Sequence, residues 1–450
     1  MELANDLKER LNDAVIFMEH LRKAGDFVEI VFDGGIDGAA AAAIIARVLV
    51  ALKIPFVIRH LTQVDVERLG TPLILVEVGV LKRISSKLKE IEALIIDHHL
   101  HAEDLTRKGV VLVNPYFLGM DGSIEACCSS ISMLLSRELG IEDKIIPLLT
   151  CLGVEGDNQV LSRTPAIFGV NLEVLKPYLD RGVLRVRNKL KLFATSRLSL
   201  HRSLTYTFKP LLPGLTGREE AVKTFLSELG LNTEFEHIQE GGAEPRLAPE
   251  LLQALIKRAI SSGIDLAEVE VLFGPTFEYC ETTPPLNVYD ESTVMDLCVS
   301  SGNYGLPLSG YVKGELRTCL DHHLEEALTH VKSLCEELNR LKPLDEGAVK
   351  VFRVKDLPSG LTIHVARALR SMYPENVVMV IQSLNSEVKV SICVGRRLKW
   401  DLESSKSLIK YIGDLGGVGW GLRDEVEALS PSDKLRDLVE RVGALINHEG

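Results

Sequence analysis

The eight cysteines of this 450-residue sequence include no CxxC pair, the spacing found in zinc ribbons and in thiol–disulfide exchange sites. Most of them, including the adjacent Cys127 and Cys128, stand in apolar segments. This setting is typical of buried thiols in a reducing compartment. The sequence therefore argues against a disulfide framework and against a zinc ribbon.

The sequence also lacks an excess of basic residues, because 63 Asp and Glu outnumber 51 Lys and Arg to give a formal net charge of −12. This charge argues against a broad basic face that neutralises phosphates, so any contact with nucleic acid must be made by a local groove. No apolar run is long enough to span a bilayer, and the N-terminus has no signal-peptide pattern. We expect a soluble, cytoplasmic protein without a membrane partner.

The length exceeds that of one ordinary domain, and a hydrophobic share of 46% is enough to fill two or three cores. Over about the first 160 residues, short apolar runs alternate with segments of helical periodicity. Such alternation predicts an α/β fold with a doubly wound parallel sheet.

The most informative segment of the sequence is the apolar run from Ala93 to Ile96, which leads directly into Asp97, His98 and His99. An apolar run of this kind predicts a strand buried on both faces. Ligands bind at the carboxyl edge of open parallel sheets, where a carboxylate and two imidazoles suit metal or phosphate chemistry. The simpler alternative is a turn at the strand end with a solvated histidine pair.

The same tripeptide occurs a second time, as Asp321, His322 and His323. Here it lies inside the segment from Leu320 to Leu334, whose apolar residues recur with the period of a helix. We therefore expect this second copy to be a solvated helix surface.

A second candidate position is the turn from Asp33 to Gly38, between a predicted strand (Phe27 to Phe32) and an Ala-rich helix (Ala39 to Leu52). Free backbone N–H groups at a helix N-terminus suit an anion, and Asp33 and Asp37 could hold a cation beside it. The alternative is an ordinary turn capped by aspartate. The turn lacks the GxGxxG and GxxxxGK[ST] spacings, which argues against a dinucleotide site or a P-loop.

Two further acidic residues follow apolar segments. Glu77 stands near the end of the predicted strand from Leu73 to Val78, and Asp157 follows the apolar stretch from Ile145 to Val154 in a Gly-Asp-Asn sequence. Carboxylates at the ends of parallel strands point to one common sheet edge.

The Asp-Gly turn, the acidic strand end, the strand followed by Asp-His-His and the Gly-Asp-Asn sequence occur in the order that is typical of the DHH phosphoesterase superfamily, which includes the RecJ exonucleases. The segment from Pro213 to Gly217 is similar to the middle region of archaeal RecJ-like proteins, and the segment from Val349 to Glu427 resembles the DHH-associated C-terminal domain. The resemblance implies a DHH domain at 1–202, a middle α+β module at 203–345 and a smaller α/β nucleic-acid-binding domain at 346–450.

Members of this superfamily hold two ions, Mn²⁺ or Mg²⁺, that activate a water and clamp the phosphate. Their first motif, His-x-Asp-x-Asp-Gly, becomes Asp33, Gly35 and Asp37 here. Gly35 has no side chain to coordinate metal, so the resemblance implies that one ion position is impaired and that two ions are doubtful. The residues that would hold the other ion are Asp37, Glu77, His98 and Asp157.

The resemblance also assigns roles to the remaining residues of the two motifs. His99 would face the phosphate, and Asp97 would orient an imidazole. Asp33 would be what is left of the impaired position.

Nucleic-acid contacts are expected in the C-terminal domain. Arg396 and Arg397 follow the predicted strand from Val388 to Val394, and a glycine-rich loop contains Gly416, Gly417 and Gly419. The alternative for the two arginines is simple solvation. Trp420 either stacks on a base or anchors the core.

Two functions remain open on this resemblance. One is a nucleic-acid-binding scaffold of DNA replication or repair with a weak or inactive centre, like the eukaryotic cell-division-cycle member that joins the GINS complex and a helicase. The other is an active manganese-dependent exonuclease specific for single strands. Because Gly35 leaves the first ion position incomplete, we favour the scaffold.

Overall fold

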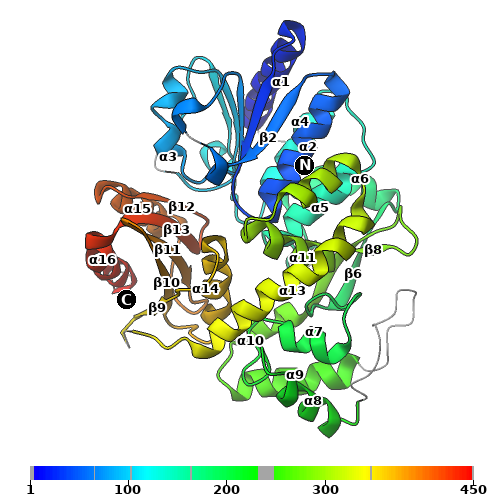
Figure 1. The fold of residues 1–450 in the computed structure, drawn as a ribbon, viewed down its shortest axis with the longest axis vertical. Helices are drawn as coiled ribbons and strands as arrows, with labels where there is room; N and C mark the ends of the chain where they lie inside the picture. The colour runs from blue at the N-terminus through cyan, green and yellow to red at the C-terminus, as the bar shows by residue number, and fades with distance from the viewer. Residues whose placement is uncertain are drawn as a thin grey trace.

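The computed structural model describes residues 5–64, 66–101, 104–162, 165–231, 248–344 and 347–447. It contains three sheets that follow one another along the chain (Figure 1). Short 3-10 helices lie between the main elements: η1 (Leu61–Gln63), η2 (Val66–Arg68), η3 (Lys87–Lys89), η4 (Pro115–Leu118), η5 (Glu270–Leu272), η6 (Ser359–Leu361) and η7 (Ser432–Lys434). Among the described residues, no helix combines the length and the apolar character needed to cross a membrane.

The first sheet is parallel throughout and has the strand order β2-β1-β3-β4-β5. Its strands are β1 (Val28–Phe32), β2 (Phe56–His60), β3 (Leu73–Val76), β4 (Ala93–Ile96) and β5 (Val110–Val113). Every residue of β1, β3 and β4 is buried, because both faces of the sheet are covered. The predicted doubly wound parallel sheet is confirmed.

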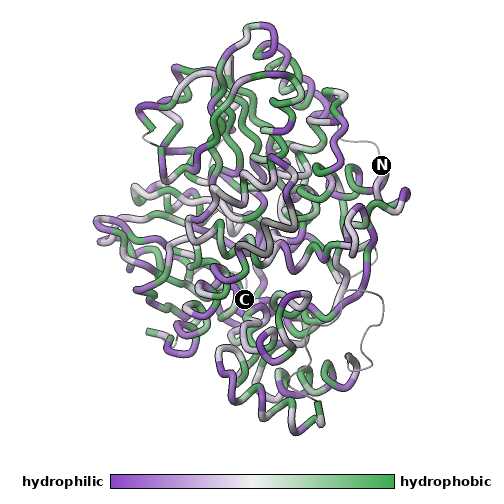
Figure 2. Tube along the Cα trace, turned by 45° about the vertical axis from the view of Figure 1, so that its right-hand side comes forward, coloured by the Kyte–Doolittle hydropathy of each residue, from purple (hydrophilic) through white to green (hydrophobic). Residues whose placement is uncertain are grey.

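Successive residues of the central strands enter two different cores. Ile30 and Phe32 pack with helices on one face, whereas Val31 packs on the other. The first face is covered by α1 (Asn5–Ala24), α2 (Ile36–Leu52), α4 (Cys128–Glu138) and α5 (Ile146–Gly156), and the second face by α3 (Leu81–Ile84). Figure 2 shows the strands of this sheet as hydrophobic segments inside the upper part of the molecule.

The second sheet has three antiparallel strands, β6 (Leu184–Leu190), β7 (Phe273–Tyr279) and β8 (Leu286–Asn287). Strand β6 lies before the predicted boundary at residue 202 but pairs with β7 beyond it, and the boundary stays a prediction. The helices of this region are α6 (Gly169–Asp180), α7 (Leu200–Tyr206), α8 (Glu219–Glu228), α9 (Ala248–Ser261), α10 (Leu266–Val269), α11 (Val288–Ser300), α12 (Gly305–Lys313) and α13 (Leu316–Arg340).

The second Asp-His-His copy lies in α13, as its helical period predicts. The expectation of a solvated surface is wrong for His323, which is only 3% exposed because α13 packs this face against α11. The side chains of Asp321 and His322 lie outside the described residues.

The third sheet is mixed, with the order β12-β13-β11-β10-β9 and one parallel pair, β9 with β10. Its strands are β9 (Val349–Arg353), β10 (Val377–Leu384), β11 (Glu387–Val394), β12 (Val418–Gly421) and β13 (Glu425–Pro431). Its helices are α14 (Thr362–Arg370), α15 (Leu402–Asp414) and α16 (Leu435–Asn447). The predicted combination of a parallel-sheet domain with a smaller α/β unit at the C-terminus is confirmed.

Strand β12 joins this unit to the first sheet. The backbone N–H of Leu100 donates to the carbonyl of Gly421 at 2.6 Å. The indole of Trp420 is 6% exposed and packs against Gly79, where any Cβ would collide with it. Of the two roles open to Trp420, the structure shows the core anchor.

The predicted glycine-rich loop is wrong in part. Gly416 has a left-handed φ of +85° in the turn after α15, but Gly419 lies inside β12 and pairs with Ala428. A Cβ at Gly417 would be 2.6 Å from the carbonyl oxygen of Leu429, and a Cβ at Gly419 would be 3.0 Å from Cδ1 of Ile412, so both positions are tightly packed. These two glycines fit β12 against α15 rather than forming an open loop.

Candidate metal centre

Four of the predicted side chains converge at the carboxyl edge of the first sheet. Asp37 stands in the first turn of α2, Glu77 follows β3, His98 follows β4 and Asp157 follows α5. Each offers a ligand atom that lies within 4.8 Å of the others. Asp37, Glu77 and His98 are at most 5% exposed, and the side chain of Asp157 is 14% exposed.

His98 is oriented as a ligand. Its Nδ1 lies 2.8 Å from the carbonyl oxygen of Gly122, and a carbonyl only accepts, so Nδ1 carries the proton. The lone pair on Nε2 is then directed at Asp157 Oδ2, 3.2 Å away. Metal-binding histidines use this arrangement, in which a backbone carbonyl fixes the tautomer and the free nitrogen faces the ion.

Three buried atoms of this group have no hydrogen-bond partner among the described residues: Glu77 Oε2, His98 Nε2 and Asp157 Oδ2. Leaving one such group unsatisfied costs about 1–3 kcal/mol. Burial raises the pKa of Glu77 and of Asp157 well above the usual carboxyl range, and the neighbouring Asp37 carboxylate raises both pKa values further. A divalent cation would satisfy all three atoms, so the residues fit a metal ion.

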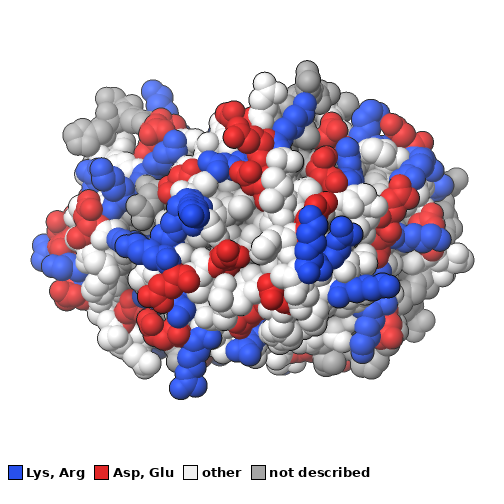
Figure 3. All heavy atoms as spheres, turned by 90° about the horizontal axis from the view of Figure 1, so that it is seen from above, with Lys and Arg blue, Asp and Glu red and all other residues white. Residues whose placement is uncertain are grey.

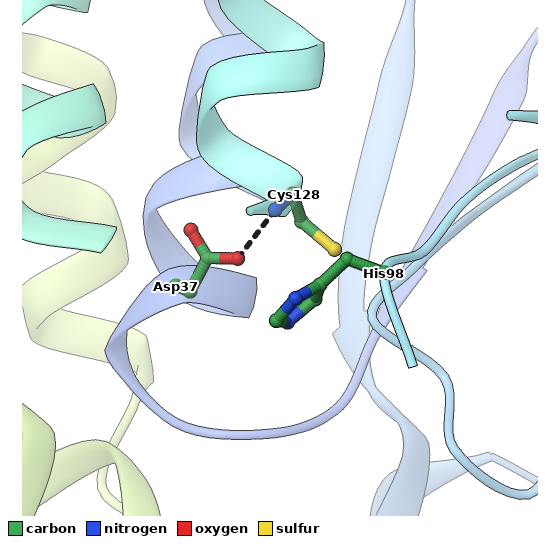
Figure 4. A group of neighbouring side chains, drawn as sticks. All are labelled: Asp37, His98 and Cys128. Atoms are coloured by element: carbon green, nitrogen blue, oxygen red, sulfur yellow. Dashed lines mark hydrogen bonds between the residues drawn. The ribbon is translucent and has the colours of Figure 1, made fainter. Parts of the chain in front are cut away.

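Asp37 also fixes the start of α4. Its Oδ2 accepts from the backbone N–H of Cys128 at 2.6 Å, and its Oδ1 accepts from that of Ser129 at 3.0 Å (Figure 4). Each carboxylate oxygen has a second lone pair that remains available to an ion. Figure 4 also shows the Cys128 thiol close to His98, and burial raises the pKa of this thiol well above its usual range.

Glu77 reaches this position through an unusual backbone. Its φ is +55°, in the left-handed region that residues other than glycine seldom occupy. The carboxylate lies over the start of α2, where a Cβ at Gly34 in the preceding turn would be 2.5 Å from Oε1 and a Cβ at Gly38 in the first helical turn would be 2.7 Å from Oε2. The two glycines make room for a side chain one methylene longer than aspartate.

Asp97 holds two histidines rather than facing the ion position. Its Oδ1 lies 2.8 Å from Nδ1 of His99, and its Oδ2 lies 2.8 Å from Nε2 of His101. Burial alone would raise the pKa of Asp97, but His101 and His99 outweigh it and keep that pKa well below the usual range. Sequence reasoning missed His101, although its spacing of four residues from Asp97 was a usable signal.

Asp33 is not part of the four-residue group. Its Oδ1 lies 3.6 Å from Nε2 of His60, and its side chain is 24% exposed. His60 is in turn stacked on Tyr304, with ring centroids 4.4 Å apart. Asp33 thus faces a neighbouring imidazole of β2.

The place of a side chain at residue 35 is filled by Asp296 of α11. A Cβ on Gly35 would collide with Asp296 Oδ1, which accepts from the backbone N–H of Ile36 at 3.0 Å. Its Oδ2 lies 3.5 Å from Nε2 of His364 of α14. Sequence reasoning missed Asp296 and His364, since neither belongs to a motif.

Sequence reasoning also missed two cations, Arg367 and Lys209, which follow the first sheet in the chain and lie near this centre. Arg367 of α14 donates from Nε and Nη2 to Glu425 Oε2, at 2.9 and 2.7 Å, and its charge partly offsets the raised pKa of Asp157. Burial, together with the neighbouring Arg367 charge, lowers the pKa of Lys209 to about 8. Arg367 therefore lies within electrostatic range of both Asp157 and Lys209.

Arg396 and Arg397 are engaged elsewhere. Arg396 pairs with Glu268 at 2.6 Å, and Arg397 pairs with Asp265 at 2.6 Å. These contacts join the C-terminal unit to the segment around α10. Both side chains stay exposed, Arg396 by 39% and Arg397 by 55%, so simple solvation and a role in phosphate binding both remain open for them.

The raised pKa values of Glu77 and Asp157 predict the pH dependence of metal binding. An acid whose pKa is higher in the folded state loses stability as the pH rises from its unfolded to its folded pKa, because its charged form is disfavoured. Mn²⁺ needs that charged form. We expect the rise in melting temperature that Mn²⁺ causes to grow between about pH 5 and pH 8, as thermal denaturation at fixed ionic strength would show. A rise that shrinks with pH would contradict this centre.

Known proteins resemble this chain more in fold than in sequence. No family model matches the sequence. An uncharacterised protein of Methanocaldococcus jannaschii is 24% identical over 223 residues, which are 46% of this chain and 49% of that protein. The match thus spans about half the length of this curated relative.

Solved structures match over nearly the whole chain. CDC45 of Entamoeba histolytica has a TM-score of 0.62 at 12% identity, covering 99% of each chain. RecJ of Thermus thermophilus in complex with Mn²⁺ has a TM-score of 0.54 at 14% identity, covering 98% of this chain and 55% of RecJ. The chain therefore has the fold that CDC45 and RecJ share, the fold that its ordered DHH-superfamily motifs predict.

Proposed function

We propose that this protein is a RecJ-like nucleic-acid-binding scaffold of DNA replication or repair that holds one divalent ion in a weak or inactive centre. The observation that carries the proposal is the set of three unpartnered atoms on Glu77, His98 and Asp157. They converge on one point, whereas Asp33 faces His60 and Gly35 lies under Asp296. One ion position is complete and the other is not.

Two-metal hydrolysis needs ions about 3.5–4 Å apart, one beside the attacking oxygen and one beside the leaving oxygen. When bound, a single Mn²⁺ or Mg²⁺ supplies Lewis-acid polarisation of a phosphate oxygen. Of the chain's own residues, His99 is positioned by Asp97 to hold a phosphate by hydrogen bonding. No second group of ligands is present around Asp33 in the described part of the chain, so activation of a water is the missing step.

The proposed nucleic-acid contact is local. On the face shown in Figure 3, the described Lys and Arg side chains are interspersed with Asp and Glu instead of forming one broad basic surface. Lys209 and Arg367 are the cations that we expect a phosphate at the metal centre to meet, because Arg367 already acts on Asp157. Affinity should be modest and should fall with salt, because the net charge of −12 repels a polyanion.

The replication context comes from the resemblance and from the CDC45 fold. CDC45 of Entamoeba histolytica covers 99% of this chain, so the middle and C-terminal regions are shared as well as the first sheet. By the resemblance of the sequence motifs alone, GINS and helicase proteins are the proposed partners. A nuclease assay with Mn²⁺ on labelled single-stranded DNA and RNA tests the proposal. Activity at background or slightly above it supports the scaffold, whereas strong activity that His98→Ala abolishes supports the exonuclease.

We expect Lys209→Gln to reduce the salt dependence of single-strand binding. Removing one phosphate contact should flatten the slope of log K against log salt by about 0.7. Fluorescence anisotropy with a labelled oligonucleotide at several salt concentrations measures the slope. The comparison is the double variant Arg396→Gln and Arg397→Gln, which should flatten the slope less than Lys209→Gln because both arginines are paired with carboxylates. A slope that is flatter only in the double variant would show that these arginines, and not Lys209, contact the phosphate.

A further inference from the structure

A second cluster of side chains that could hold a metal ion lies between α11 and α13 and shares no residue with the centre described above. Cys298 of α11 and His323 and Glu326 of α13 each offer a ligand atom, and the three atoms lie within 4.8 Å of one another. Cys298 is fully buried and His323 is 3% exposed. The cluster includes the histidine that the sequence pattern had placed on a solvated surface.

The spacing within the cluster suits a tetrahedral ion. Nδ1 of His323 lies 3.3 Å from Oε2 of Glu326. Two ligand atoms bound to tetrahedral zinc at the usual bond lengths are about 3.4 Å apart. The imidazole and the carboxylate therefore already have the separation of two zinc ligands, and the thiol needs to move by only about 1 Å.

A fourth donor stands on the same face of α13. Residues 323, 326 and 330 follow the spacing of three and four residues that aligns side chains along a helix. Nε2 of His330 lies 3.8 Å from Oε1 of Glu326. This nitrogen is therefore the candidate for a fourth ligand beside the three side chains of the cluster.

We propose that Cys298, His323 and Glu326 bind Zn²⁺, with His330 as the fourth ligand. A thiolate and an imidazole select zinc over Mn²⁺ and Mg²⁺, which prefer oxygen ligands. On binding, the S–H bond of Cys298 breaks, sulfur keeps the electron pair as thiolate, and the proton passes to solvent. This inference does not depend on the proposed function.

The ion would tie α11 to α13. The Cys298 thiol now makes a weak contact with the carbonyl of His323 at 3.6 Å, so the two helices already meet at this point. Helix α11 also carries Asp296, which accepts from Ile36 at the start of α2. Zinc would thus hold α11 in place, and with it the Asp296 side chain that occupies the space beside Gly35.

Cobalt substitution tests the site in the full-length protein. Co²⁺ added to metal-stripped protein should give a thiolate-to-cobalt charge-transfer absorption, which Zn²⁺ should remove by displacement. Cys298→Ser should abolish the absorption and weaken zinc binding at least about 100-fold, because even partners outside the ligand set are worth about 10–100-fold. Cys335→Ser is the matched control, since Cys335 is a buried thiol of α13 outside the cluster.

Two further variants keep the test decisive. His323→Gln retains the thiol and should also weaken zinc binding, which covers the case in which Cys298→Ser does not fold. Cys128 lies beside the first metal centre and is a second thiol that Co²⁺ could reach. Asp157→Asn impairs that centre and should leave the cobalt absorption intact. Absorption that survives Cys298→Ser, or that disappears in Asp157→Asn, would overturn the proposal, as would the absence of zinc binding to the parent protein.

Discussion

Asp157→Asn should weaken Mn²⁺ binding at least about 100-fold while it stabilises the metal-free protein. Oδ2 of Asp157 lies 3.2 Å from Nε2 of His98, neither atom has a hydrogen-bond partner among the described residues, and burial disfavours the charged carboxylate. An asparagine amide would donate to Nε2 and would remove a buried ionisable group. Satisfying these atoms should raise the free energy of unfolding by about 1–3 kcal/mol.

The two effects have opposite signs, which separates metal ligation from a purely structural role. Calorimetric titration measures the affinity, and denaturant unfolding in the presence of a chelator measures the stability. Asp33→Asn is the control, because Asp33 lies outside the four-residue group and should leave the affinity nearly unchanged. Equal losses in the two variants would show that Asp33 belongs to the ion site.

Gly35→Asp, the change that restores the family's first motif most directly, should destabilise the protein by about 2–4 kcal/mol and should not raise activity. The φ of Gly35 is −91°, outside the left-handed region that favours glycine. The cost arises because the new Cβ meets Asp296 Oδ1 and displaces its hydrogen bond to Ile36. A second carboxylate beside the first adds repulsion.

A double-mutant cycle checks this explanation. Adding Asp296→Ala to Gly35→Asp should cost less than the sum of the two single changes, since the truncated residue leaves room for the new one. Gly35→Ala isolates the steric part of the cost. Adding Asp33→His to the double variant then tests whether a second ion restores nuclease activity in Mn²⁺. A Gly35→Asp variant as stable as the parent would contradict the described contact.

The first sheet and the convergence of its ligands could be predicted from the sequence. Apolar runs such as Ala93–Ile96 have few ways to be buried other than as central strands. Because parallel strands end at one edge, Glu77 and His98 had to meet there, and Asp37 and Asp157 joined them from helix ends next to that edge. These positions follow from local pattern and topology.

The groups that complete the surroundings could not be predicted in this way. Asp296 and Arg367 lie far along the chain and reach the centre only through tertiary packing of α11 and α14. The second Asp-His-His copy shows the same limit, because helical period identifies α13 but does not say that α11 covers His323. Tertiary contacts decide which polar residues of a helix are buried.

Titration of the full-length protein with Mn²⁺ in a calorimeter tests the single-ion centre most directly. We expect about one tight site per chain, and we expect it to be lost in Asp157→Asn and retained in Asp33→Asn. Two tight sites, or one site that survives Asp157→Asn, would contradict a centre built from Asp37, Glu77, His98 and Asp157.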